Sequence, residues 1–152
     1  MENNSTTSAN RELKISRTFN APIELVWEAW SNPNQLKIWW GPDGFTTTIH
    51  KMDLVANGEW LLTLHGPDGT NYPNKAQFIE VVPFEKIVYK HFNPNFLVTI
   101  IFEAAGQQTH IHWSSLFDSA KQLEAVIAVY KADEGLKQNV ERLAAYLNQG
   151  TN

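Results

Sequence analysis

The sequence predicts an α+β domain in which helices cover one face of a single antiparallel sheet. Three observations support this fold class: one strand-like segment precedes two short helical segments, six more strand-like segments follow with short links, and the C-terminal part is helix-forming almost to its end. Short links join antiparallel neighbours, because a crossover between parallel strands needs a dozen or more residues. We therefore expect one sheet of six to seven strands with a long helix across it.

Local patterns mark the first strand and two short helices. Residues 12–19 alternate between apolar and polar side chains, which is typical of a strand with one buried face, and Arg17 falls on the apolar side. Pro22 and the pair Asn32-Pro33 are start signals for helices. The turn segment Gly-Pro-Asp-Gly at 41–44 ends the second helix.

Turn-forming residues divide the middle of the chain into six further strands. We expect these strands at residues 45–54, 59–65, 75–82, 86–92, 96–103 and 108–117. Beyond them, Asp118 and Ser119 are good helix caps, and apolar side chains between Ala132 and Leu147 are spaced by three and four residues. This spacing predicts one long C-terminal helix.

Length and composition indicate a single domain. The chain has 152 residues, of which 43% are apolar, and this is enough for one hydrophobic core but not for two. Residues 1–10 are mostly Ser, Thr and Asn, so they cannot offset the entropy lost on ordering. We expect a disordered N-terminal arm over residues 1–10 and one domain over residues 11–150.

Charge and cysteine content exclude several classes of function. The chain contains no cysteine, which excludes disulfides and thiolate metal sites. Its net charge is −4 and it has no basic run, so nucleic acid is not an expected partner. The apolar runs are far shorter than the roughly 20 residues of a membrane helix, and the opening segment does not resemble a signal peptide. We expect a soluble, cytoplasmic protein with no membrane partner, either a monomer or a homodimer.

Aromatic residues make up an unusual share of the chain. Six Trp, four Tyr and eight Phe account for 12% of the residues. Each aromatic side chain buries on the order of 150–250 Å². These side chains can fill a large core or line an apolar cavity, and composition does not distinguish between the two.

Several segments resemble one known family. They are ISRTFNAPIELVWEAWSNP at 15–33, WWGPDGF at 39–45, NGEW at 57–60, the stretch from His65 to Tyr89, and DEGLKQNVERLAAYL at 133–147. Together they resemble the activator of Hsp90 ATPase homologues, members of the START-like (SRPBCC) helix-grip superfamily. One departure is Leu136, where the family usually carries Trp.

The resemblance implies a curved sheet wrapped around the C-terminal helix, with a cavity between them. Superfamily members bind lipids, sterols, polyketides or plant hormones in this cavity, and a few are cyclases. We therefore expect this chain to bind a small hydrophobic ligand that is lipid-, polyketide- or aromatic-like. Two alternatives stay open: a chaperone ATPase cofactor that acts by surface contact in the stress response, and a cyclase or hydrolase that uses the cavity. No catalytic residue, cofactor or metal is predicted.

Alternation along the strands and the face of the C-terminal helix give candidate ligand-binding residues. His91 is the only histidine expected to point inward, so an enzymatic reading depends on it. Gly135 is unusual because glycine inside a helix costs roughly 0.5–1 kcal/mol relative to alanine. Either it opens space for a ligand or an aromatic side chain, or it allows close packing. The candidates are Arg17, Trp60, Leu62, Tyr89, His91, Val98, Ile100, Trp113, Gly135, Leu136 and Asn139.

Two further histidines have a spacing that could chelate a metal. His110 and His112 are two residues apart on one strand and therefore share a face. Ile111 and Trp113 occupy the opposite, inward face. We therefore expect both histidines to face solvent, and we predict no metal site.

Overall fold

The computed structural model describes residues 10–149. They form one seven-stranded antiparallel sheet in the order β1-β7-β6-β5-β4-β3-β2, which confirms the predicted fold class. Apart from Asn10, the arm predicted over residues 1–10 lies outside the described residues. The strands are β1 (Glu12–Phe19), β2 (Thr46–Met52), β3 (Glu59–His65), β4 (Asn71–Val82), β5 (Lys86–Phe92), β6 (Phe96–Ala105) and β7 (Gln108–Phe117).

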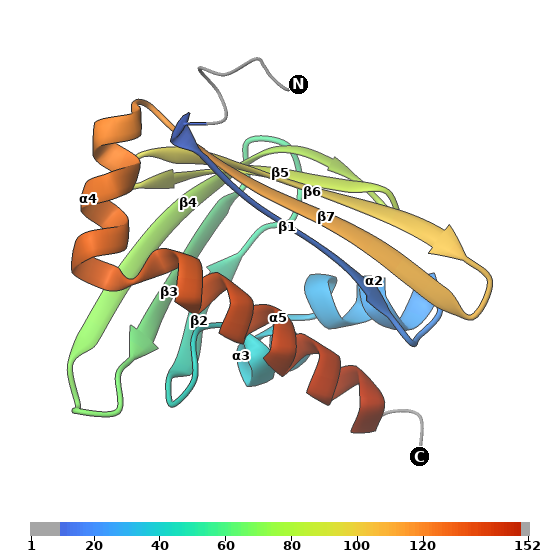
Figure 1. Cartoon of the computed structure of the whole chain (residues 1–152). Coiled ribbons are helices and arrows are strands. Elements are labelled where there is room, and N and C mark those ends of the chain that lie inside the picture. The colour runs from blue at the N-terminus through green and yellow to red at the C-terminus, as the bar shows by residue number, and fades with distance from the viewer. Residues whose placement is uncertain (1–9, 150–152) are drawn as a thin grey trace.

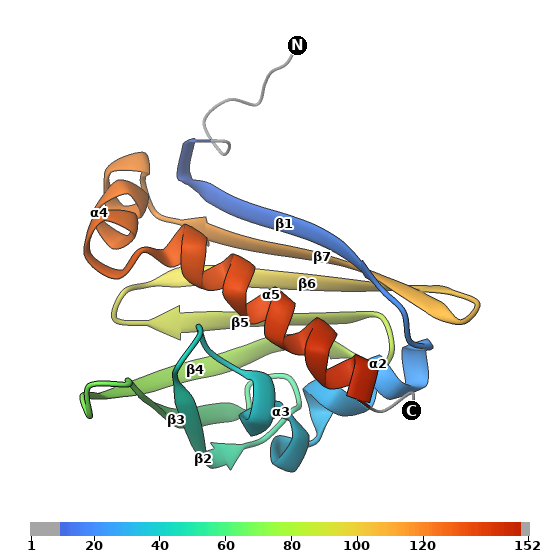
Figure 2. The same cartoon turned by 60° about the horizontal axis from the view of Figure 1, so that its bottom comes forward.

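Four helices lie on the concave side of the sheet (Figures 1 and 2). They are α2 (Ile23–Ser31), α3 (Pro33–Trp39), α4 (Ala120–Tyr130) and α5 (Ala132–Gln149). The expected caps are present: Asn32 accepts a hydrogen bond from the Asn34 N–H at 2.9 Å, and Ser119 accepts one from the Gln122 N–H at 3.0 Å. The sheet curves over α5, while α2 and α3 cover one end of it and α4 covers the other.

The prediction of one long C-terminal helix was wrong. Lys131 has a φ of 52°, a left-handed conformation that ends α4, and α5 begins one residue later. Left-handed backbone is usually marked by glycine or asparagine, and neither is present here. The local signals are weak: Val129 and Tyr130 are only moderate helix formers, and the acidic pair Asp133-Glu134 lies in the first turn of α5. The break lets α4 pack on β7 while α5 crosses to β1 and α3.

β4 also begins earlier than predicted. The sequence analysis placed its start at Lys75, but the strand extends back to Asn71 and pairs with β3 as far as His65. Pro73 lies within this extension. Proline is tolerated in strands chiefly at edges and near strand ends, and Pro73 lies near the start of β4. As a result, Tyr72 and Asn74 belong to the sheet.

The core is densest where α2 and α3 meet the sheet. Trp30 is 2% exposed and its ring lies 4.9 Å from Trp39, 5.7 Å from Phe102 and 5.1 Å from Trp113, with edges against faces. Leu143 on α5 is fully buried beside this cluster of side chains. Nearly perpendicular rings at these separations add to the stabilisation from burial.

None of the helices in the described part of the chain is long and apolar enough to cross a membrane.

Candidate ligand-binding cavity

A cavity of about 260 Å³ lies between the sheet and the two C-terminal helices. Its walls come from β1, the α3–β2 link, strands β3 to β7, α4 and the first turns of α5. Most of the side chains that line it are apolar or aromatic. They are Leu13, Trp40, Gly41, Pro42, Trp60, Leu62, Leu64, Asn74, Ala76, Tyr89, His91, Phe96, Trp113, Ser115, Phe117, Val126, Tyr130, Ala132, Gly135, Leu136 and Asn139.

Tryptophan rings form much of the wall. Trp40 and Trp113 are stacked with their centroids 5.7 Å apart and their planes 18° from parallel. Trp60 lies 5.1 Å from Trp40 and meets Tyr89 edge to face at 5.1 Å. These contacts hold the rings against one another, so the wall is both apolar and fixed in shape.

A second hollow of about 520 Å³ adjoins this cavity and shares Pro42, Leu64, Asn74, His91, Phe96, Val126 and Tyr130 with it. Its rim lies between α4 and the end of the sheet. Three large apolar or aromatic side chains on this rim are exposed: Tyr72, Val129 and Tyr130. We call this second hollow the vestibule, because it is open to the surface and shares part of its wall with the inner cavity.

His91 lies where the two hollows meet, and both of its ring nitrogens are occupied. Nδ1 is 2.9 Å from the Pro94 carbonyl oxygen, and Nε2 is 2.6 Å from Oδ1 of Asn74. The ring also stacks on Phe96 at 4.5 Å. Burial lowers the pKa of His91, and the hydrogen bond to Pro94 only partly opposes this effect. The ring is therefore largely neutral at pH 7 and carries one N–H, so it donates either from Nδ1 to the Pro94 carbonyl oxygen or from Nε2 to the Asn74 side-chain oxygen.

Tyr89 is the other titratable side chain of the inner wall. It is 5% exposed, and burial raises its pKa far above the ordinary value. Its hydroxyl therefore stays neutral at physiological pH. No Asp, Glu, Lys or Arg is among the described residues that line the cavity.

Two polar groups on the cavity walls have no hydrogen-bond partner among residues 10–149. They are the carbonyl oxygen of Asn139, a residue on α5 that is 7% exposed, and the indole N–H of Trp60, a residue on β3 that is 3% exposed. Buried polar groups are nearly always hydrogen-bonded in folded proteins. The indole N–H of Trp30 in the packed core is a third such group within the described residues, but only Trp60 and Asn139 lie on a cavity that has room for a partner.

The structure brings most of the predicted site residues to this cavity. Arg17, Val98 and Ile100 are not on its wall. Val98 and Ile100 are fully buried in the core, because alternation identifies the inward face of a strand but not where along that face a cavity lies. Arg17 reaches across to α5 and pairs with Glu141 at 2.5 Å. The predicted residues that line the cavity are Trp60, Leu62, Tyr89, His91, Trp113, Gly135, Leu136 and Asn139.

The sequence analysis did not identify Arg142, which lies outside the cavity but binds the backbone of the segment that forms part of its wall. Its Nη1 donates to the carbonyl oxygens of Gly41 and Pro42 at 3.0 and 2.9 Å, and its Nη2 donates to that of Ile38 at 3.1 Å. Burial lowers its pKa, which the charge of Asp43 partly opposes. Arg142 thus holds the segment that carries Trp40, Gly41 and Pro42 into the wall. Its position seven residues after Gly135, on the same helix face, was the available signal.

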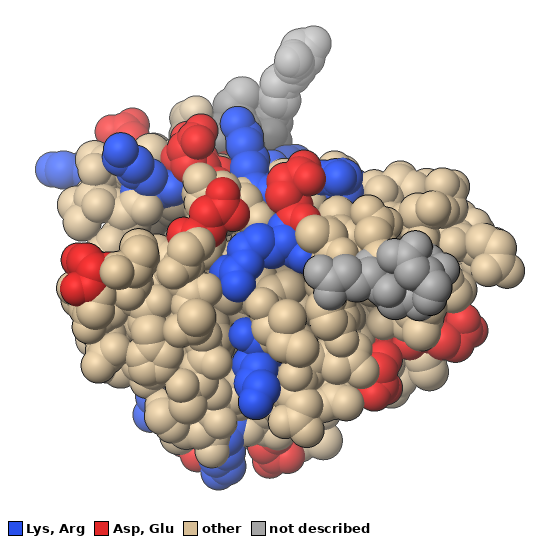
Figure 3. Space-filling view, turned by 90° about the horizontal axis from the view of Figure 1, so that it is seen from below, with Lys and Arg blue, Asp and Glu red and all other residues tan. Residues whose placement is uncertain are grey.

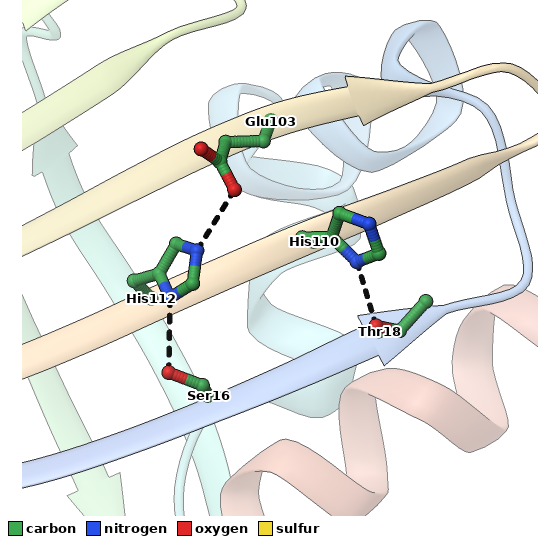
Figure 4. Close-up of polar contacts among 5 residues, drawn as sticks. All are labelled: Ser16, Thr18, Glu103, His110 and His112. Atoms are coloured by element: carbon green, nitrogen blue, oxygen red, sulfur yellow. Dashed lines mark hydrogen bonds and ion pairs between the residues drawn. The ribbon is translucent and has the colours of Figure 1, made fainter.

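The histidines of β7 face away from the cavity, as alternation indicated (Figure 4). His110 Nδ1 lies 2.6 Å from the Thr18 hydroxyl, and His112 lies 2.9 Å from both the Ser16 hydroxyl and a Glu103 carboxylate oxygen. No cluster of three or more potential metal ligands occurs within the described residues.

Acidic and basic side chains are interspersed on the face of the molecule shown in Figure 3. Wide uncharged areas separate them. On this face no large patch of a single charge is visible.

Comparison with known proteins gives consistent results. Residues 20–148 match the family described as Activator of Hsp90 ATPase homolog 1-like protein. A search of curated proteins finds no significant match.

Several solved structures share the fold. A protein from Arthrobacter aurescens aligns with a TM-score of 0.86 and 22% identity over 93% of this chain and 88% of its own. Protein Ms6760 from Mycobacterium smegmatis aligns with a TM-score of 0.84 and 23% identity over 94% of each chain. The AHSA1 protein from Silicibacter pomeroyi aligns with a TM-score of 0.76 and 19% identity over 91% of this chain and 99% of its own. At these identities the likeness establishes the fold alone.

Proposed function

The chain belongs to the Activator of Hsp90 ATPase homolog 1-like family, and on this basis we propose that it binds a small hydrophobic molecule in the cavity between the sheet and helices α4 and α5. The observation that carries the proposal is the aromatic cavity itself, which leads through a vestibule to an apolar rim. Protein interiors are normally close-packed, and an empty apolar cavity lowers stability. A ligand that fills the space would recover these contacts.

Binding is better supported than catalysis by His91. A general base needs a free nitrogen directed at the reacting group, whereas Pro94 and Asn74 occupy both nitrogens of this ring. The described cavity wall also provides no carboxylate that could act in its place. A chaperone partner and a role in the stress response stay predictions of the family resemblance, and a cytoplasmic location stays a prediction of the sequence.

The proposal can be tested with N-phenyl-1-naphthylamine, a neutral probe whose fluorescence rises in apolar surroundings. The purified protein should bind it saturably at one site. Leu136→Trp places the larger side chain that the family usually carries here on the cavity wall, so it narrows the cavity and should weaken binding of this probe. Leu97→Trp is the matched control, because Leu97 is 38% exposed on β6 and lies outside the cavity wall. Absence of saturable binding, or equal binding by both variants, would contradict the proposal.

A further inference from the structure

The ligand's chemistry can be narrowed from the polar groups of the cavity. The inner wall carries no charged side chain within the described residues, and His91 and Tyr89 are both kept neutral there. Moving an ionised group from water into such a site is strongly unfavourable without a partner of opposite charge. A carboxylate, phosphate or ammonium group has no such partner in the inner cavity.

Asn139 is the exception in this apolar wall. Its side chain is 7% exposed, it lies on the cavity surface of α5, and its carbonyl oxygen has no partner among residues 10–149. A primary amide offers two donors and one acceptor. A leucine in the same place would pack against the rings without this penalty. The unpaired carbonyl oxygen of Asn139 is therefore best explained by a hydrogen-bond donor that arrives with the ligand.

The indole N–H of Trp60 adds a second requirement from the sheet side of the cavity. It is also buried without a hydrogen-bond partner in the described chain. An indole N–H can only donate, whereas the Asn139 oxygen can only accept. A hydroxyl group both donates and accepts, so one small uncharged group of this kind can pair with either atom.

The size of the cavity limits the body of the ligand. An apolar cavity of about 150 Å³ is enough to hold one benzene molecule. The inner cavity here is about 260 Å³, with stacked tryptophans on one side. It therefore has room for a body of roughly two fused rings, and any longer substituent would extend into the vestibule.

We infer that the ligand is an uncharged molecule with a flat body of about two rings and a hydroxyl or similar group that hydrogen-bonds to the amide of Asn139. This inference rests on the proposed function, since it assumes that the cavity binds a ligand.

Three probes with the same ring system separate these features: naphthalene, 2-naphthol and 2-naphthoate. Dissociation constants at pH 7 are measured by titration with protein NMR signals as the readout. We expect 2-naphthol to bind roughly three- to tenfold more tightly than naphthalene, the effect of one net hydrogen bond. The ionised 2-naphthoate should bind more than tenfold more weakly than 2-naphthol.

Asn139→Leu should remove the preference for 2-naphthol over naphthalene while leaving naphthalene binding as tight or tighter. Asn148→Leu is the matched control: the same substitution, on the same helix, at an exposed position outside the cavity wall. It should keep the preference.

Equal binding of naphthalene and 2-naphthol by the unaltered protein would overturn the inference and leave the proposed function standing. Retention of the 2-naphthol preference in Asn139→Leu would overturn the role of Asn139, and tight binding of 2-naphthoate would overturn the requirement for a neutral ligand. If none of the three probes binds, the inference fails. If N-phenyl-1-naphthylamine also fails to bind, the proposed function fails with it.

Discussion

The two ends of the domain use aromatic side chains in opposite ways. At the packed end, formed by α2, α3 and the second half of α5, Trp30 is 2% exposed and packs edge to face against Trp39 and Phe102. At the hollow end, formed by α4 and the first half of α5, Trp40, Trp60 and Trp113 line a cavity of about 260 Å³. Both ends share one sheet and one helix, so the difference comes from the side chains and from the break at Lys131.

This comparison suggests that stability and binding are divided along α5. Leu143 and Leu147 lie in the packed core and are at most 5% exposed, whereas Gly135 and Leu136, two turns earlier, are partly exposed on the cavity wall. Contacts at the packed end can stabilise the fold while the hollow end stays available for a ligand. Substitutions along this one helix therefore test the division directly.

The largest expected effect is at the packed end. Leu143→Ala should lower the free energy of unfolding by about 2–5 kcal/mol, because it leaves a void among fully buried side chains. Leu136→Ala makes the same chemical change beside a space that is already open, and we expect a loss of about 1 kcal/mol. Urea denaturation of both variants measures the contrast. Equal losses would mean that the two ends do not differ in packing.

Asn139→Leu should raise the free energy of unfolding, whereas the two leucine substitutions lower it. It replaces a buried amide that lacks a partner with an apolar side chain of similar size, so stability should rise by about 1–3 kcal/mol in the absence of ligand. Asn148→Leu on the exposed side of α5 should change stability much less. A clear loss of stability in Asn139→Leu would show that the amide has a structural role.

Sequence patterns were sufficient to place most of the fold and the cavity wall. Alternation assigned Trp60, Tyr89 and Trp113 to the inner face and His112 to the outer one, because successive side chains in a strand point to opposite sides. Alternation could not show that Val98 and Ile100 lie in the packed core and not on the cavity wall. Both face inward, and only tertiary packing determines which inward side chains border the cavity.

The omissions have different physical causes. Trp40 follows the end of a short helix, and its orientation depends on the Arg142 contacts to the α3–β2 link. Asn74 lies in the part of β4 that precedes the predicted start of the strand at Lys75. The break at Lys131 has no glycine or proline to mark it. In each case long-range packing determines the local structure, and a single sequence does not show such packing.

His91 allows a test at the junction of cavity and vestibule. Burial lowers its pKa in the folded state below the ordinary value of 6.5, so the unfolded chain takes up this proton at a higher pH than the folded chain does. The stability that the folded state gains from the neutral ring is therefore fully present above about pH 6.5, and it is lost as the pH falls below this value. His91→Asn should reduce the loss of stability between pH 7 and pH 5, measured by urea denaturation at each pH.

The control for this test is His50→Asn, because His50 is exposed on β2, where its Nε2 lies 2.8 Å from the Thr63 hydroxyl. It should leave the pH dependence of stability close to that of the unaltered protein. An identical pH dependence in all three proteins would show that burial of His91 does not set its protonation.

The smallest expected effect is at Gly135, in the first turns of α5. A Cβ atom added there would meet only the Cβ of Pro42, at an ordinary contact distance of 3.7 Å. Gly135→Ala should therefore raise stability by about 0.5–1 kcal/mol through helix propensity. Gly106→Ala is the contrasting control, because Gly106 has a φ of 66° and alanine is strained in that conformation.

Gly135→Leu then separates the two interpretations of this glycine. If Gly135 keeps the cavity wall open, the larger side chain should weaken binding of N-phenyl-1-naphthylamine while unfolding stays cooperative, because the leucine fills space that belongs to the ligand. If instead the glycine allows close packing against Pro42, the same change should lower stability by about 1–3 kcal/mol. Thermal unfolding and probe titration on the same samples distinguish these outcomes. Undiminished stability together with unchanged probe binding would exclude both interpretations and remove the first turns of α5 from the binding region.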